Sequence, residues 1–452
     1  MIRFALPLIL IALVVWPCSP KPPDNPDGNR SDRKQPDSDL KRDTVDQGIE
    51  VTFYPAYGYR QGTDWVIHIR SWVHEIRDST ATPRTQLGKL KKKAEAFATT
   101  SICGGVEGNA LKQRLRDFSA GDINGQQIEI IFDSDPDRKH YPLRPNDTNG
   151  DPNGLSDRNG LIESKLKLPD ATYQKFRNSP DSTKGWLTYH AASDTGKALT
   201  GKGRIRLIEP EGTSVVTDID DTIKVSDVPA KKEIVLRNAF CCGFVAAPKM
   251  PGIYRDLGDV PFHYVSGGPW QLYGPLYDYL IYDPGAYPEG TFHLRSIPKN
   301  ILEEETRKVL RGVVSDAVFE KMFGSLKGTY LHKQKEIAKL MDNFPARKFI
   351  LIGDSGEMDP EVYRWFKENP KYSRQVKEIR IRDVINDQEV NHQRLDGMNV
   401  IPAETIICAT QSHYKKVAAM IKSLYGLSYK PAPCDQASSA ARMPCPGSVQ
   451  HD

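Results

Sequence analysis

The chain has 452 residues, of which 38% are hydrophobic, and its 62 Lys and Arg residues nearly match its 58 Asp and Glu residues. This length exceeds one ordinary hydrophobic core, so two folded domains with flexible ends are expected. A mean hydropathy of -0.53 excludes a polytopic membrane protein. The net charge of +4 is too small to indicate binding to nucleic acid, and no such partner is expected.

Residues 1–18 are typical of an export signal. Arg3 precedes an apolar run from Phe4 to Trp16, which is shorter than the roughly 20 residues of a membrane-spanning helix. A buried N-terminal helix is the alternative, but the Pro-rich and charged residues 19–48 offer it no partner and are expected to form a disordered linker. The prediction is therefore an exported protein, periplasmic, cell-envelope or extracellular, with lipidation of Cys18 as an alternative that would anchor it to the membrane.

Six cysteines remain after Cys18, and an even number in an exported chain permits disulfides. Cys434 and Cys445 could close a local loop within residues 427–452, which resemble the linker in composition and are also expected to be disordered. The adjacent Cys241 and Cys242 cannot easily bond to each other.

Residues 49–210 contain short β-rich runs separated by clusters of Gly, Asn, Asp and Pro. This pattern predicts a small antiparallel β-sandwich-like domain. The runs begin at Trp65, Gln126, Leu161, Trp186 and Gly203.

One loop of this region places Asp147, Asn149 and Asp151 at the alternate positions that calcium loops use. Pro152 stands where an EF-hand requires glycine. Because Asn, Asp and Gly also concentrate in hairpin loops, an ordinary loop is the simpler interpretation.

Over residues 211–426 the pattern changes to short apolar strands separated by amphipathic segments. Such alternation predicts a doubly wound α/β domain with a mostly parallel sheet and helices on both faces. The expected strands are SVVTD, FHYVSG, KFILIGD and EIRIRDV. Ligands of such a sheet gather at the carboxyl ends of its strands.

Asp218, Asp220 and Thr222 follow the first of these strands with the spacing D-x-D-x-T. If both carboxylates face one pocket, they repel each other unless a cation lies between them, which favours a hard metal such as Mg²⁺. Asp218 is then a candidate nucleophile toward phosphorus, and Asp220 a candidate acid and base. The alternative is an acidic turn that caps a following helix.

Three further features have the residue types that phosphoryl transfer requires. Ser266 ends a strand before two glycines, whose backbone N–H groups can approach an anion. Lys333, near a predicted helix start, can offset negative charge. Asp354 and Asp359 would complete a metal site, although Asp359 and the proline after it also fit the start of a helix, with Asp359 as its N-cap.

These motifs together resemble a known family. VTDIDDTIKVSDV, FHYVSGGPWQLYGPL, YLHK and FILIGDSGEMDPEVY, spread over roughly residues 212–412, are similar to the phosphatidate phosphatase catalytic-domain family named after an actin-patch protein, a branch of the haloacid-dehalogenase superfamily. The resemblance implies a haloacid-dehalogenase-like fold, Mg²⁺, and hydrolysis of phosphatidate to diacylglycerol.

The resemblance also implies a role for each motif residue. Asp218 is the nucleophile, Asp220 the acid and base, and Ser266 a phosphate-binding hydroxyl. Lys333 balances charge. Thr222 joins this catalytic group, and the metal-binding set is Asp218, Asp220, Asp354 and Asp359.

Alternatives remain for substrate and surroundings. The site residues recognise only a phosphoryl group, so a phosphatase for a soluble phosphomonoester is a second hypothesis. A third hypothesis is a catalytically idle module that binds the cell envelope. Aromatic residues after the serine motif suit either core packing or peripheral membrane contact, namely Trp270, Tyr273, Tyr277, Tyr279 and Tyr282. Arg295 and Arg382, near strand ends, could bind phosphate or form ion pairs.

Overall fold

The computed structural model describes residues 49–75, 114, 121–144, 155–179, 185–192, 199–282, 287–297, 301, 304–305, 308–309 and 313–432. All of them belong to one compact unit, Gln47–Asp452. The predicted export signal, the linker, the Asp147 loop, and Cys18, Cys103, Cys434 and Cys445 lie outside these residues. Of the predicted tail 427–452, residues 433–452 also lie outside, whereas residues 427–432 are described, and Leu427 and Tyr429 pack against a hydrophobic cluster. None of the helices described is long and apolar enough to cross a membrane.

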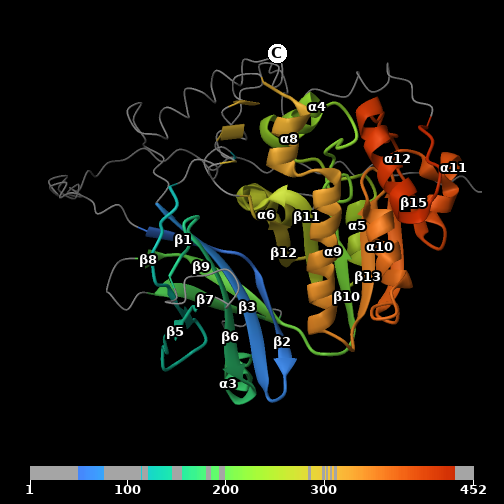
Figure 1. The fold of residues 1–452 in the computed structure, drawn as a ribbon. Coiled ribbons are helices and arrows are strands. Elements are labelled where there is room, and N and C mark those ends of the chain that lie inside the picture. The colour runs from blue at the N-terminus through green and yellow to red at the C-terminus, as the bar shows by residue number, and fades with distance from the viewer. Residues whose placement is uncertain are drawn as a thin grey trace, which may run out of the picture. The chain divides into compact units, whose positions relative to one another are not determined.

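The first half of the described chain folds into a nine-stranded sheet (Figure 1). Its strands are β1 Ile49–Phe53, β2 Ala56–Gln61, β3 Asp64–Glu75, β4 Glu129–Phe132, β5 Tyr141–Pro142, β6 Leu161–Pro169, β7 Trp186–Ala192, β8 Leu199–Thr200 and β9 Lys202–Leu207. Helix α3 Asp170–Phe176 follows β6. The sheet is mixed, because β1–β8 and β2–β9 pair in parallel; the expectation of a purely antiparallel domain is therefore wrong.

This sheet curls back on itself. Its order is β5-β4-β7-β9-β2-β3-β1-β8, with β6 on β3, so the edge strand β8 continues after one residue into the internal strand β9. Gly201 permits the junction, since a Cβ there would lie 2.3 Å from the backbone oxygen of Val51. The curled strands enclose a core that includes Trp65, Phe132 and Tyr189.

The second half contains a six-stranded sheet whose strands are β10 Thr213–Thr217, β11 Phe262–Pro269, β12 Gly290–Arg295, β13 Lys348–Asp354, β14 Val376–Asp383 and β15 Asn399–Pro402. Its order is β12-β11-β10-β13-β14-β15, and every pair is parallel. The predicted parallel sheet is confirmed. Because β10 and β13 lie at its centre, the ends of these two strands form the middle of its carboxyl edge.

Helices cover both faces of this sheet, as neighbouring strand residues show (Figure 1). Val215 packs in a cluster with residues of α5 (Met250–Asp256) and α6 (Tyr273–Tyr282). Val216 packs in a second cluster with residues of α9 (Leu326–Asn343), α10 (Asp359–Glu368) and α12 (Gln411–Tyr425). The helices are α4 Lys232–Leu236, η1 Arg237–Cys241, α5 Met250–Asp256, η2 Trp270–Leu272, α6 Tyr273–Tyr282, α8 Asp316–Phe323, α9 Leu326–Asn343, α10 Asp359–Glu368, α11 Asp387–Val390, η3 His392–Leu395 and α12 Gln411–Tyr425.

The two sheets share hydrophobic cores across the predicted boundary at residue 210. Tyr54 and Trp72 belong to the first cluster of the parallel sheet, and Tyr57 and Ile208 belong to the second. The domain limits themselves stay predictions. Cys241, Cys242 and Cys408 are all disulfide-bonded.

Candidate active site

The loop after β10 presents the predicted nucleophile. The Asp218 N–H donates to Ile352 O at 2.9 Å, which continues the β10–β13 pairing up to that residue. Asp221 then takes a left-handed conformation with φ of 56°. Its carboxylate accepts the N–H groups of Ser226, Asp227 and Val228 at 2.7–2.9 Å and closes the loop. Residues 218–231, all described, contain no helix, so the alternative of a helix-capping turn is wrong.

Lys333 projects from α9 into a group of carboxylates. Its Nζ lies 2.8 Å from Asp218 Oδ1, 2.6 Å from Asp359 Oδ1 and 3.6 Å from Glu357 Oε2. The side chain is only 2% exposed, and burial alone would lower its pKa. The three carboxylates more than offset this and raise the pKa of Lys333 well above its usual value, so it is a cation.

Three of the four predicted metal-binding residues converge. Oxygens of Asp218, Asp354 and Asp359 lie within 4.8 Å of one another, and all three side chains are buried. Thr222 Oγ1 lies between two of them, 3.2 Å from Asp218 Oδ2 and 3.4 Å from Asp354 Oδ2. Met358, rather than Asp359, is the N-cap of α10. The Asp359 carboxylate instead accepts hydrogen bonds from Lys333 Nζ and the Asp354 N–H, so the capping alternative is wrong.

Asp220 turns to different partners. Its Oδ1 accepts from Lys224 Nζ and, at 2.6 Å, from Ser226 Oγ, while its Oδ2 accepts from Ser266 Oγ at 3.3 Å. Burial would raise the pKa of Asp220, but Lys224 and the hydrogen bonds lower it overall. The Asp220 carboxylate therefore lies with Ser266, the serine predicted to bind phosphate, rather than with the three converging carboxylates.

Ser266 lies in an irregular part of β11. The pairing of β11 with β12 runs to Val265 and resumes at Pro269, so residues 266–268 fall between the paired positions. The Gly268 N–H donates to Ser266 Oγ at 3.0 Å. A Cβ at Gly267 would lie 2.8 Å from the Thr329 side chain of α9, which explains the glycine at this close approach. The Ser266 hydroxyl thus lies at a break in the β11–β12 pairing, beside the carboxylate of Asp220.

The charge balance of the site favours a metal ion. Five carboxylates (Asp218, Asp220, Asp354, Glu357 and Asp359) meet two ammonium groups (Lys224 and Lys333). Burial raises the pKa of Asp218 and Asp354 well above their usual values and that of Glu357 to about 7. Asp218 Oδ1 is buried, and the Lys333 ammonium at 2.8 Å contacts it. Oxygen ligands without Cys or His suit Mg²⁺ better than Zn²⁺.

Several neighbours of the site were not predicted from the sequence. Glu357 and Asp221 stood inside the quoted motifs, but each motif already held a carboxylate with a clearer role. Of the two arginines that the sequence singled out, Arg382 donates to the backbone oxygen of Asp221 at 2.7 Å and pairs with Glu404 at 4.0 Å, so it supports the loop. Arg295 Nη1 is buried with no hydrogen-bond partner among the described residues.

The aromatic residues after the serine motif are mainly core residues. Trp270 and Tyr279 are buried in the first cluster, and Tyr273 and Tyr277 pack against it. Core packing therefore accounts for these four. The side chain of Tyr282 lies outside the described part.

A parallel α/β sheet with carboxylates and two buried lysines at its carboxyl edge is a site suited to metal-assisted phosphoryl transfer. Residues 213–383 match the family model described as "Phosphatidate phosphatase APP1, catalytic domain". The match confirms the resemblance that the motifs predicted for this part of the chain.

Two curated relatives are similar to part of the chain. Phosphatidate phosphatase APP1 of Saccharomyces cerevisiae is 29% identical over 161 residues, which cover 34% of this chain and 24% of that protein. An uncharacterized protein of Schizosaccharomyces pombe, C29B5.04c, is 23% identical over 194 residues, which cover 40% of this chain and 27% of that protein. The chain thus spans about a quarter of the length of these relatives.

Among solved structures, the putative polysaccharide deacetylase BA0330 from Bacillus anthracis matches at 9% identity, covering 74% of this chain and 88% of that chain. The TM-score of 0.14 is too low for any argument about the fold.

Proposed function

We propose that the chain is an exported, Mg²⁺-dependent phosphatase of the haloacid-dehalogenase type that hydrolyses phosphatidate to diacylglycerol and phosphate. The observation that carries the proposal is the buried carboxylate of Asp218, which contacts Lys333 and lies with Asp354 and Asp359 at the end of β10. The substrate class is suggested by the name of the matching family and of the yeast relative. The three disulfide-bonded cysteines support an oxidising compartment outside the cytosol.

In the proposed mechanism, Asp218, Asp354 and Asp359 would hold Mg²⁺, which would offset the negative charge of the phosphoryl oxygens. Asp218 attacks phosphorus, the bond from phosphorus to the ester oxygen breaks, and an aspartyl phosphate forms. Lys333 and Ser266 bind the phosphoryl oxygens as charge develops on them.

Asp220 handles the protons. It gives a proton to the departing alkoxide, then takes one from the water that attacks the aspartyl phosphate and frees Asp218. In the resting site, burial raises the pKa of Asp220, but Lys224 and the hydrogen bonds together lower it below its usual value. The incoming phosphate dianion has the opposite effect to Lys224, because a nearby negative charge favours the protonated acid.

The proposal is tested by phosphate release from phosphatidate in mixed micelles and from soluble sugar and nucleotide phosphates, each with and without Mg²⁺. We expect Mg²⁺-dependent release that is fastest from phosphatidate, and a loss of at least about 10³-fold in Asp218→Asn, which keeps the side-chain shape but removes the nucleophile. Faster release from soluble esters would favour the second substrate class. Release that needs no metal would contradict the metal site, and no release from any ester would favour the idle binding module.

A further inference from the structure

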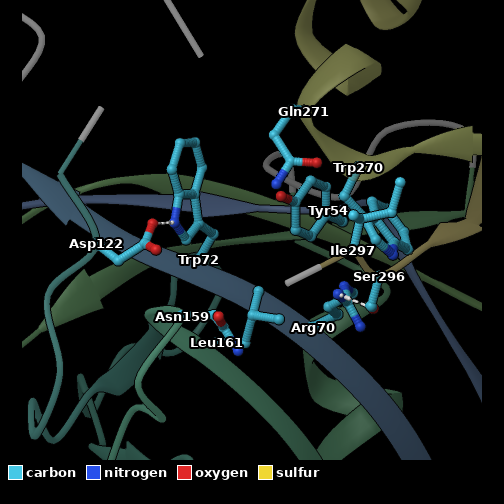
Figure 2. Close-up of a pocket in the computed structure, with 10 residues that line it drawn as sticks. All are labelled: Tyr54, Arg70, Trp72, Asp122, Asn159, Leu161, Trp270, Gln271, Ser296 and Ile297. Atoms are coloured by element: carbon cyan, nitrogen blue, oxygen red, sulfur yellow. Dashed lines mark hydrogen bonds between the residues drawn. The ribbon is translucent and has the colours of Figure 1, made fainter. Parts of the chain in front are cut away.

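The contact between the β-rich half and the loop after Ser266 contains a small cavity (Figure 2). Tyr54, Arg70 and Trp72 line it from the nine-stranded sheet, and Trp270 and Ser296 line it from the parallel sheet. Its volume of 20 Å³ holds about one water molecule. The cavity is therefore too small for a substrate, and the relevant feature is the set of contacts among the side chains that line it.

Arg70 of β3 is the central side chain of this contact. Its guanidinium stacks on the Trp270 ring at 4.5 Å, and its Nη2 donates to Ser296 Oγ at 2.7 Å, while Nη1 pairs with Glu163. The Tyr54 ring lies 4.2 Å from the Trp270 ring. Burial lowers the pKa of Arg70 to about 10, so the side chain keeps the charge that such stacking needs.

Trp270 stands four residues after Ser266, directly beyond the irregular part of β11. Residues 266–268 have no partner in the β11–β12 pairing, and two of the three are glycines, so this pairing does not fix their backbone. Thr329 of α9 limits movement on one side of Gly267. At the far end of the segment, Pro269 pairs with Arg295 and Trp270 is buried against Arg70 and Tyr54.

We propose that Arg70 is a positioning residue, which fixes Trp270 and thereby holds the phosphate-binding segment 266–268 in place. The β-rich half is then part of the catalytic apparatus and not an independent module. The kinetic consequence rests on the proposed phosphatase function, whereas the ordering of the segment does not.

Arg206 of β9 offers a matched control. The side chain of Arg206 is 15% exposed, as is that of Arg70, and each of the two connects the β-rich half to residues next to β11. It contacts the opposite end of that strand, where Nη2 donates to Asp259 Oδ1 at 2.9 Å and Nη1 to Val260 O at 3.4 Å. Arg206→Met removes an interdomain contact without touching the serine segment.

The first test compares kcat/KM for a soluble aryl phosphate among the wild type, Arg70→Met, Arg70→Lys and Arg206→Met, all as the full chain. We expect Arg70→Met to lose about tenfold to a hundredfold, since small misplacements of binding groups have effects of this size. Arg70→Lys should recover part of the loss because it keeps a cation over Trp270. Arg206→Met should stay within about twofold while its melting temperature falls as much as that of Arg70→Met.

The second test needs no activity. Amide hydrogen exchange of peptides covering residues 262–272 should accelerate in Arg70→Met and not in Arg206→Met. Unchanged exchange in Arg70→Met, or equal kinetic losses in both Met variants, would overturn the positioning role. If the wild type released no phosphate, the proposed function would fail, and the exchange result alone would decide the inference.

Discussion

Lys333 is the residue on which the charge balance of the site depends most. It is 2% exposed and is surrounded by the carboxylates of Asp218, Glu357 and Asp359. Removing one partner from such a group leaves buried negative charge without a counter-ion, which is far more costly than losing an ion pair at the surface.

Lys333→Met is therefore expected to lower both stability and activity. The free energy of unfolding should fall by about 3 kcal/mol or more, and kcat should fall at least about 100-fold because a cation that stabilises the transferring phosphoryl group is lost. Urea unfolding and phosphate release measure the two effects. Lys339→Met on the same helix is the control, since Lys339 is 43% exposed and its pair with Glu336 is 3.8 Å long, so a comparable loss there would contradict the argument.

At this scale the sequence predicted the meeting of Asp218, Asp354 and Asp359 but misplaced Asp220, and the reason for the success is topological. Asp218, Ser266 and Asp354 lie at or near the ends of three adjacent parallel strands, and those ends lie along one edge whatever the details of packing. The partners that were missed, Glu357 and Lys224, are placed by turns whose conformation no residue spacing reveals. Their direction depends on contacts such as Lys224 with Asp220.

At the scale of elements, β11 and α9 approach closely where residues 266–268, the proposed phosphate-binding segment, pass the helix. A methyl group at Gly267 would lie 2.8 Å from Thr329 Oγ1 and Cγ2, whereas it would lie 3.3 Å from Thr329 Cβ. The strand and helix are thus fitted to a glycine at this point, and a larger residue must displace one of them.

Gly267→Ala is expected to lower the free energy of unfolding by about 1–3 kcal/mol through this overpacking, and to slow phosphate release by shifting Ser266. Thr329→Ala should restore part of both losses in the double variant, because it removes the two closest atoms. A double-mutant cycle with urea unfolding and kinetics measures the coupling, and strictly additive effects would mean that the two residues do not clash.

The elements that could be predicted were the buried apolar strands. β10, β11, β13 and β14 carry short runs of Val, Ile, Leu and aromatic residues that a two-sided parallel sheet requires. The edge strands β12 and β15 were not predicted. The sequence of β15, NVIP, is four residues long with no buried residue, so its strand conformation depends on pairing with β14 rather than on its own pattern.

For the whole molecule, the two predicted domains prove to be joined by buried polar contacts as well as shared cores. Arg347 is 4% exposed, and its guanidinium donates to the backbone oxygens of Glu209, Glu211 and Thr213 in the connecting segment. Sequence patterns assign residues to elements but carry no record of such cross-domain contacts, which is why this joint was not predicted.

A group of histidines lies at the same joint. Tyr57 is at its centre, with ring-centroid distances of 5.4 Å to His68, 5.8 Å to His263 and 5.9 Å to His293. Burial lowers the pKa of His68 to about 3 and that of His263 well below its usual value, and it also lowers the pKa of His293. The charged groups that act on these rings are Lys165, Arg206, Glu336, Lys339 and Arg347.

The joint should therefore weaken in acid. In the folded protein His68 stays neutral down to about pH 3, whereas in the unfolded chain it takes up a proton near pH 6.5. The contribution of His68 to the free energy of unfolding is therefore fully present above pH 6.5 and is lost as the pH falls toward 3. Between pH 7.5 and 5 this one residue should lower the free energy of unfolding by up to about 2 kcal/mol. In His68→Gln, which cannot take up the proton, urea unfolding over that range should show a pH dependence smaller by this amount. Parallel curves for the two proteins would contradict the assignment, since carboxylates and the other histidines contribute equally to both.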